Sequence, residues 1–183
     1  SVTILETIGI TQSPWIRSKR VVYENDQGDR LEWDYIERTD GGISVLILPR
    51  FKRSGDILFI RQYRVIFDRY VIGFPAGVLD DEDVGVCALR ELREETGYTG
   101  KIVQVSPPLT LNSALVREVA HCVLVELEDD VPPQDQILEP SEKIEVHRVK
   151  KNGVESFFQE AVERGDLIGA GPWYMLLAMR YLF

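Results

Sequence analysis

The segment 83–96 constrains the fold of this chain more than any other stretch. Its apolar residues Val84, Ala88 and Leu92 recur every four positions, the spacing that places side chains on one face of an α-helix. Gly97 follows where a glycine commonly ends a helix. We therefore predict a helix over 83–96 that buries one face against the rest of the protein.

A second row of side chains on the predicted helix is acidic. Glu91, Glu94 and Glu95 stand at i, i+3 and i+4, so their carboxylates share one stripe and repel each other. Oxygen ligands suit a hard divalent cation, although most acidic stripes are simply solvated helix faces. A loop rich in glycine and proline precedes the helix, and Glu82 lies eight residues before Arg90. These additions favour a metal site over a solvated face.

The remaining chain alternates predicted strands and helices, with antiparallel hairpins between successive strands. This order indicates the α/β class, with a mixed sheet covered by helices. Pro75 and Gly77 interrupt regular structure in the loop 73–77, and the acidic, proline-rich segment 129–140 is predicted to be a mobile loop. We expect strands at 15–23, 31–38, 43–48, 56–64, 102–105, 119–127 and 143–149, and further helices at 154–164 and 172–182.

Composition and charge disfavour several classes of function. The length of 183 residues suits a single domain, and the net charge of −9 disfavours binding to nucleic-acid backbones. No apolar run is long enough to span a bilayer, and residues 1–6 lack the pattern of a signal peptide, so we expect a cytoplasmic protein without membrane contact. Cys87, Cys122, His121 and His147 have no zinc-site spacing and are expected to be packing or surface residues.

The residues around the predicted helix resemble the signature of the Nudix hydrolases, G-x5-E-x7-R-E-U-x-E-E-x-G-U, in which U is a bulky apolar residue. Four residues rather than five separate Gly77 from Glu82, so Ala76 holds the glycine position of the signature. The resemblance implies an α/β/α sandwich with a mixed sheet. The matching positions are Glu82, Arg90, Glu91, Leu92, Glu94, Glu95, Gly97 and Tyr98.

The same resemblance implies a metal site that takes Mg²⁺, with Mn²⁺ as an alternative. Glu91 and Glu95 correspond to the principal ligands, and Glu94 corresponds to a ligand of a further ion or a residue that orients water. The backbone carbonyl of Ala76 resembles the main-chain ligand of the family. Arg90 is expected to fix the carboxylates by charge-assisted hydrogen bonds.

Metal-assisted hydrolysis of a pyrophosphate also requires a base that accepts a proton from water. In pyrophosphatases that the chain resembles, this base is often a glutamate on a late loop before a strand. Glu142 matches that place best, with Glu139 as the alternative. For either residue alone, a solvated loop glutamate is an equally good interpretation.

Beyond the signature, the N-terminal hairpin, the loop 74–77 and the C-terminal helices are similar to those of ADP-ribose and ADP-sugar pyrophosphatases. This similarity implies that Trp15 and Trp33 stack on the adenine, one from each subunit. It also implies that Arg38 and Arg64 hold the diphosphate. The alternative is that the tryptophans pack in the hairpin or at an interface and that the arginines are exposed strand residues.

The enzymes that the chain resembles are dimers with exchanged N-terminal strands. By resemblance, residues 1–40 are expected to form a hairpin region that makes a homodimer, and residues 41–183 the Nudix hydrolase domain. The expected reaction splits ADP-ribose, or a related nucleoside diphosphate sugar, into AMP or another nucleoside monophosphate and a sugar phosphate. The alternatives are a nucleoside triphosphate or dinucleotide pyrophosphohydrolase and, from another class, a non-catalytic nucleotide-sugar sensor.

Overall fold

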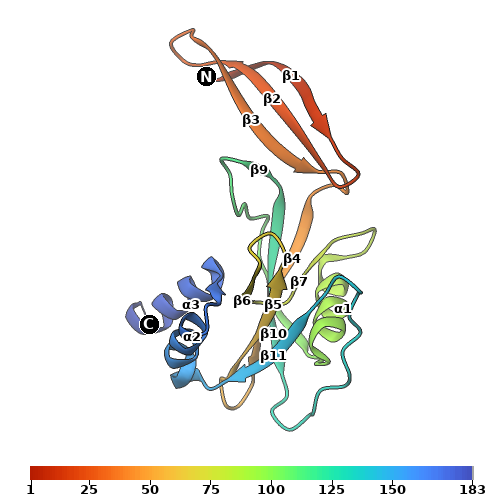
Figure 1. The fold of residues 1–183 in the computed structure, drawn as a ribbon, viewed down its shortest axis with the longest axis vertical. Helices are drawn as coiled ribbons and strands as arrows, with labels where there is room; N and C mark the ends of the chain where they lie inside the picture. Colours follow the sequence, from red (N-terminus) through yellow and green to blue (C-terminus); the bar gives the residue numbers. More distant parts are fainter. Residues whose placement is uncertain (183) are drawn as a thin grey trace.

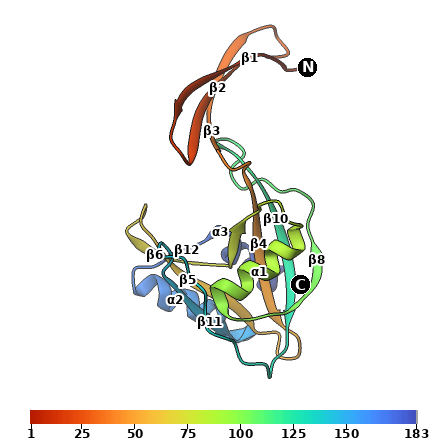
Figure 2. The same ribbon diagram turned by 90° about the vertical axis from the view of Figure 1, so that its right-hand side faces the viewer.

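The computed structural model describes residues 1–182, which form two β-sheets and three α-helices (Figure 1). The N-terminal sheet stands at one end of the molecule, away from the helices (Figures 1 and 2). Its strands are β1 (Thr3–Gln12), β2 (Ile16–Glu24), β3 (Arg30–Arg38) and β9 (Val116–Arg117). The first three pair antiparallel, and β9 joins β3 in parallel. The predicted hairpin is confirmed as β2–β3, and β1 adds a strand along its outer edge.

The second sheet forms the body of the molecule. Its strands are β4 (Ile43–Phe51), β5 (Ile57–Arg64), β6 (Arg69–Gly73), β7 (Ala76–Val78), β8 (Lys101–Val105), β10 (Val119–Leu127), β11 (Ile144–Val149) and β12 (Leu167–Ile168). They run in the order β12-β6-β5-β4-β10-β8, with β11 paired to β5 and β7 to β4. β4 and β10 pair in parallel, whereas β5, β7 and β8 pair antiparallel with their neighbours. The predicted mixed sheet is therefore confirmed.

Helices cover both faces of this sheet. α1 (Val84–Thr96) lies on one face, and α2 (Val154–Glu163) and α3 (Ala170–Tyr181) lie on the other (Figure 2). A short 3₁₀ turn, η1 (Lys151–Gly153), leads into α2. The three helices lie where the sequence predicts them, and the layers form the predicted α/β/α sandwich.

Each face of the sheet carries its own hydrophobic core. Leu58 packs with Leu92 in the core under α1, whereas the next residue of β5, Phe59, packs with Phe158 in the core under α2 and α3. Successive side chains of a strand point to opposite faces, so β5 contributes to both cores. Leu92 is fully buried, which stabilises the packing of α1 by about 2 kcal/mol.

Both ends of α1 follow the sequence prediction. The Asp83 carboxylate accepts a hydrogen bond from the Gly85 N–H at 2.8 Å, which caps the first turn. At the other end Gly97 adopts a φ of 78°, in the left-handed region that glycine tolerates. A Cβ on Gly97 would lie 1.9 Å from the Gln134 carbonyl oxygen, so no residue with a side chain fits at position 97.

The segment between β10 and β11 was predicted to be a mobile loop. It is irregular, but hydrogen bonds attach it to the C-terminal end of α1. The Gln134 N–H donates to the Gly97 carbonyl at 2.9 Å, and the Ile137 N–H donates to the Glu94 carbonyl at 2.8 Å. Separately, no helix within residues 1–182 has both the length and the apolar character needed to cross a membrane.

Candidate active site

Arg90 lies at the centre of the acidic face of α1. Its Nη1 donates to Glu91 Oε1 at 2.8 Å and to Glu94 Oε2 at 3.0 Å, and its Nη2 donates to Glu82 Oε1 at 2.5 Å. The hydrogen bond from Arg90 lowers the pKa of Glu82. One guanidinium thus holds three carboxylates of the sequence signature in a fixed arrangement.

Glu95 is the most buried carboxylate of this group, with a fractional exposure of 3%. Its Oε2 accepts a hydrogen bond from the Ala76 N–H at 3.1 Å, which joins α1 to the loop before it. Burial, together with the negative charges of Glu91 and Glu142, raises the pKa of Glu95 to about 8. The positive charge of Arg64 acts in the opposite direction. Burial and neighbouring negative charge therefore both disfavour the ionised form of Glu95.

Gly77 makes room for Glu91. A Cβ on Gly77 would lie 2.1 Å from Glu91 Cδ and 2.4 Å from Glu91 Oε1, far inside ordinary contact distance. Glu91 is half-buried, and this burial raises its pKa. By sequence spacing, Ala76 stands at the glycine position of the signature. In the structure, however, Gly77 is the residue whose missing side chain leaves space for Glu91.

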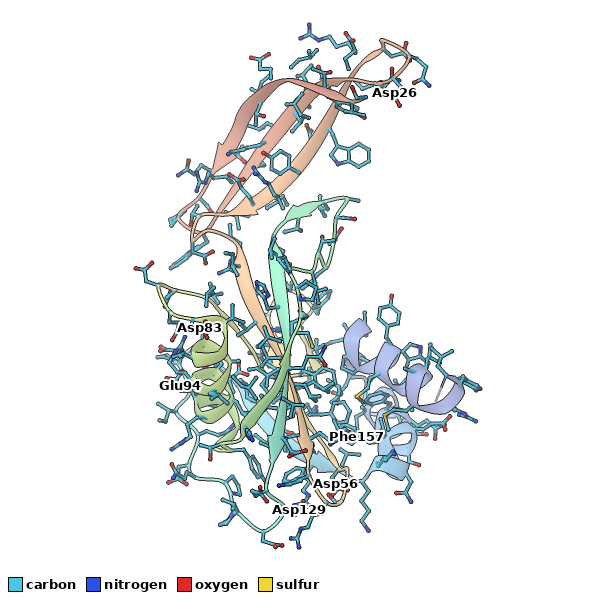
Figure 3. The ribbon with its side chains drawn as sticks, turned by 180° about the vertical axis from the view of Figure 1, so that it is seen from behind. Asp26, Asp56, Asp83, Glu94, Asp129 and Phe157 are labelled. Atoms are coloured by element: carbon cyan, nitrogen blue, oxygen red, sulfur yellow. The ribbon has the colours of Figure 1, made fainter. Side chains whose placement is uncertain are left out.

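A cavity of about 330 Å³ lies between α1, the loop around β7 and the end of β5. Figure 3 labels Asp83 at the N-terminal end of α1 and Glu94 farther along the same helix. The cavity brings together residues that are far apart in the sequence. It is lined by Gln62, Arg64, Ala76, Gly77, Val78, Asp80, Arg90, Glu91, Glu95 and Glu142.

The two glutamates considered as the base are placed differently. Glu142 is half-buried and lines the cavity, whereas Glu139 is exposed and does not line it. Backbone and side chain together shape this turn: the Glu142 N–H donates to the Glu139 carbonyl at 2.9 Å, and Glu142 Oε2 accepts from the Glu139 N–H at 2.8 Å. This geometry favours Glu142.

The donor set of the cavity fits a hard divalent cation. Its ligands would be oxygens, and a cation among them would offset the repulsion and burial that raise the pKa values of Glu91 and Glu95. Within residues 1–182, no three histidine, cysteine or acidic side chains already converge tightly enough to enclose an ion.

Three of the residues predicted to bind substrate lie outside this cavity. Trp15 is 78% exposed, and Trp33 is 53% exposed with its indole N–H donating to the Ala114 carbonyl at 2.7 Å. Trp33 lines a groove of about 600 Å³ beside β3 and β9. Arg38 lines another cavity, of about 440 Å³, and is paired with Asp40. Of the four residues predicted to bind substrate, only Arg64 lies beside the acidic cluster within a single chain.

Comparison with known proteins decides the family. Residues 41–164 match the NUDIX domain family. The chain belongs to the Nudix family. It is 33% identical over 148 residues to an ADP-ribose pyrophosphatase of Saccharomyces cerevisiae, covering 74% of this chain and 64% of the relative. It is 29% identical over 129 residues to an ADP-sugar pyrophosphatase of Mus musculus, covering 66% of this chain and 59% of the relative.

The Nudix chain thus spans less than two thirds of each of these two relatives. A solved structure described as an ADP compounds hydrolase has the same fold, with a TM-score of 0.67 and 23% identity. The superposition covers 86% of this chain and 83% of the other. It confirms the Nudix α/β/α sandwich that the sequence resemblance implies.

Two polar residues of the Nudix cavity were missed in the sequence. Gln62 is only 8% exposed and faces the cavity, and Asp80 lines it beside Val78. The signal for Gln62 was present, because it lies two residues before Arg64 and alternate residues of a strand share a face. Asp80 carried no such signal, because it lies in a turn whose path the sequence does not define.

Proposed function

We propose that this Nudix protein is a metal-dependent pyrophosphohydrolase that cleaves ADP-ribose, or a related nucleoside diphosphate sugar, to a nucleoside monophosphate and a sugar phosphate. The observation that carries the proposal is the cavity in which Glu91, Glu95 and Glu142 lie together with Arg64. The names of the two relatives, an ADP-ribose and an ADP-sugar pyrophosphatase, support this substrate class.

The proposed reaction adds water to one phosphorus of the diphosphate and breaks the bridging P–O bond. Glu91, Glu94, Glu95 and the Ala76 carbonyl would hold Mg²⁺, or Mn²⁺, which supplies charge neutralisation of the phosphate oxygens when bound. Arg64 binds the diphosphate by its guanidinium. Glu142 accepts the proton of the attacking water.

A homodimer completes the substrate site in this proposal. Trp15, Trp33 and Arg38 lie on the N-terminal sheet, outside the acidic cavity. Strand β1 of that sheet is exposed along its whole length, including the apolar side chains of Ile4 and Ile8. A second copy would bury this surface and bring the N-terminal residues of one subunit toward the cavity of the other. We also propose a cytoplasmic location, which the free thiols of the two cysteines support.

A nucleotide-sugar panel tests the proposed reaction. Purified protein is incubated with Mg²⁺ and ADP-, GDP- and UDP-sugars, and the products are identified by mass spectrometry. We expect a nucleoside monophosphate and a sugar phosphate from at least one of them, and its absence from all would reject the proposal. Release of inorganic pyrophosphate from nucleoside triphosphates would instead support a triphosphate hydrolase. Tight binding of a nucleotide sugar without any turnover would support the sensor.

Glu95→Gln tests the metal site within the same assay. The substitution keeps the size of the side chain but removes the carboxylate that would bind the cation, so we expect kcat to fall by about 100-fold or more while the fold is retained. Circular dichroism and thermal unfolding check the fold. Wild-type turnover in Glu95→Gln would remove the metal site from the proposal.

A further inference from the structure

Gln136 lies at the junction of α1 and the loop that carries Glu142. Its Nε2 donates to the carbonyl oxygen of Glu95 at 2.6 Å and to the carbonyl oxygen of Ile144 at 3.3 Å. Glu95 stands in the last turn of α1, and Ile144 is the first residue of β11, two positions after Glu142. A single side-chain amide therefore joins α1, which carries Glu91 and Glu95, to the start of the strand that follows Glu142.

Neighbouring residues of Gln136 attach the same loop to the same helix end. The last carbonyls of an α-helix have no partner within the helix. Here the Glu94 carbonyl accepts from the Ile137 N–H at 2.8 Å, and the Gly97 carbonyl accepts from the Gln134 N–H at 2.9 Å. Segment 134–137 is thus a cap for α1, built from a part of the chain about forty residues away (41 between Gln136 and Glu95).

The contacts of Gln136 differ from these backbone contacts in one respect. The backbone hydrogen bonds can form whatever side chains stand at these positions. The bridge from Glu95 to Ile144, by contrast, requires a side-chain amide at position 136. The turn from Glu139 to Glu142 has two hydrogen bonds of its own, and the residue after it, Lys143, accepts a hydrogen bond from the Tyr63 N–H of β5 at 3.0 Å. Among these contacts, the Gln136 amide is the one that joins α1 directly to the start of β11, so it contributes to the placement of the turn relative to α1.

We propose that Gln136 is a positioning residue that couples the acidic helix to Glu142, because its amide joins the Glu95 carbonyl to the start of β11. The inference rests on the proposed function for its effect on catalysis. It acts through Glu142 and does not touch the substrate. Displacement of a reacting group by about 1 Å costs about 100-fold in rate, so even a small shift of this loop is expected to be visible in kcat.

Gln136→Leu removes the amide and retains a side chain of similar size. We expect kcat on the best nucleotide sugar to fall by about 10- to 100-fold, with KM changed by less than about threefold. Gln134→Ala is the matched control: it removes a hydrogen bond from Arg93 to the same loop but leaves the bridge intact, so its kcat should stay within about twofold of wild type. Wild-type kcat in Gln136→Leu would overturn the proposal.

A double-mutant cycle with Glu142→Gln separates positioning from general destabilisation. If Gln136 acts through Glu142, Gln136→Leu should lower kcat little further once Glu142 is already replaced. Fully additive losses would overturn the proposal, because they would show that the two residues act independently.

Hydrogen exchange tests the same coupling without activity. The hydrogen-bonded amides of Glu139 and Glu142 should exchange about tenfold faster in Gln136→Leu than in wild type and Gln134→Ala. If the wild-type protein hydrolyses no nucleotide sugar, the proposed function fails by itself, and this exchange measurement still decides the bridge. Unchanged protection of the Glu139 and Glu142 amides would overturn the coupling.

Discussion

Gly77→Ala offers a test of the site that leaves all charged residues in place. The new Cβ would lie 2.1 Å from Glu91 Cδ, so the carboxylate must withdraw by about 1.3 Å or more to restore an ordinary contact. It then loses the alignment that its 2.8 Å hydrogen bond with Arg90 now fixes. A displacement of about 1 Å at a reacting centre lowers kcat by about 100-fold, which corresponds to about 2.7 kcal/mol in activation free energy.

The fold should tolerate Gly77→Ala much better than the site does. The backbone of Gly77 is not in the left-handed region, and the group in the way is the end of a flexible side chain. Turning Glu91 away from its preferred rotamer costs about 1 kcal/mol, and the loss of glycine entropy in the unfolded chain returns about 0.4–1 kcal/mol. We therefore expect Tm to change by less than about 4 °C.

The assay compares kcat, the Kd for Mg²⁺ from calorimetry, and thermal unfolding in wild type and Gly77→Ala. Gly73→Ala is the control, because a Cβ on Gly73 would meet nothing within 4 Å. It should behave as wild type in all three measurements. Unchanged kcat and Mg²⁺ affinity in folded Gly77→Ala would refute the argument that Gly77 is needed to seat the Glu91 carboxylate.

Two further predictions concern the N-terminal sheet and the opposite end of the molecule. Trp33→Ala should raise KM by about tenfold and leave kcat within about twofold of wild type, because stacking on a base contributes about 1–3 kcal/mol. An unchanged KM in steady-state kinetics would show that Trp33 is a packing residue and does not bind the substrate. Asp129 lies near Asp56 in Figure 3, and hydrogen bonds from Ser54 and Arg53 lower its pKa from 3.8 to about 2. The stabilising effect of its carboxylate is therefore present above about pH 4 and is lost as the pH falls toward 2. The Tm of Asp129→Asn should accordingly lie below that of wild type near neutral pH and approach it only as the pH falls to about 2. A constant difference in Tm between neutral pH and about pH 2 would contradict the assignment.

The sequence alone determined the elements whose signals are local. The four-residue spacing of Val84, Ala88 and Leu92 and the glycine at 97 determined α1, because helix periodicity and a left-handed C-cap depend only on residues within a few positions of each other. The same spacing placed Glu91 and Glu95 on one face. Resemblance to the Nudix signature identified the family before any tertiary contact was known.

Only the tertiary structure decided what those carboxylates face. Gly77 leaves space for the Glu91 side chain, and Gln62 lines the same cavity as the carboxylates, because β5 and β7 lie against α1 in space. The segment 129–140 has the composition of a free loop, yet its residues cap α1, since the orphan carbonyls of a helix end accept any donor that the fold brings near. Such long-range pairings leave no periodic trace in the sequence, so composition predicted a loop but could not reveal its partner.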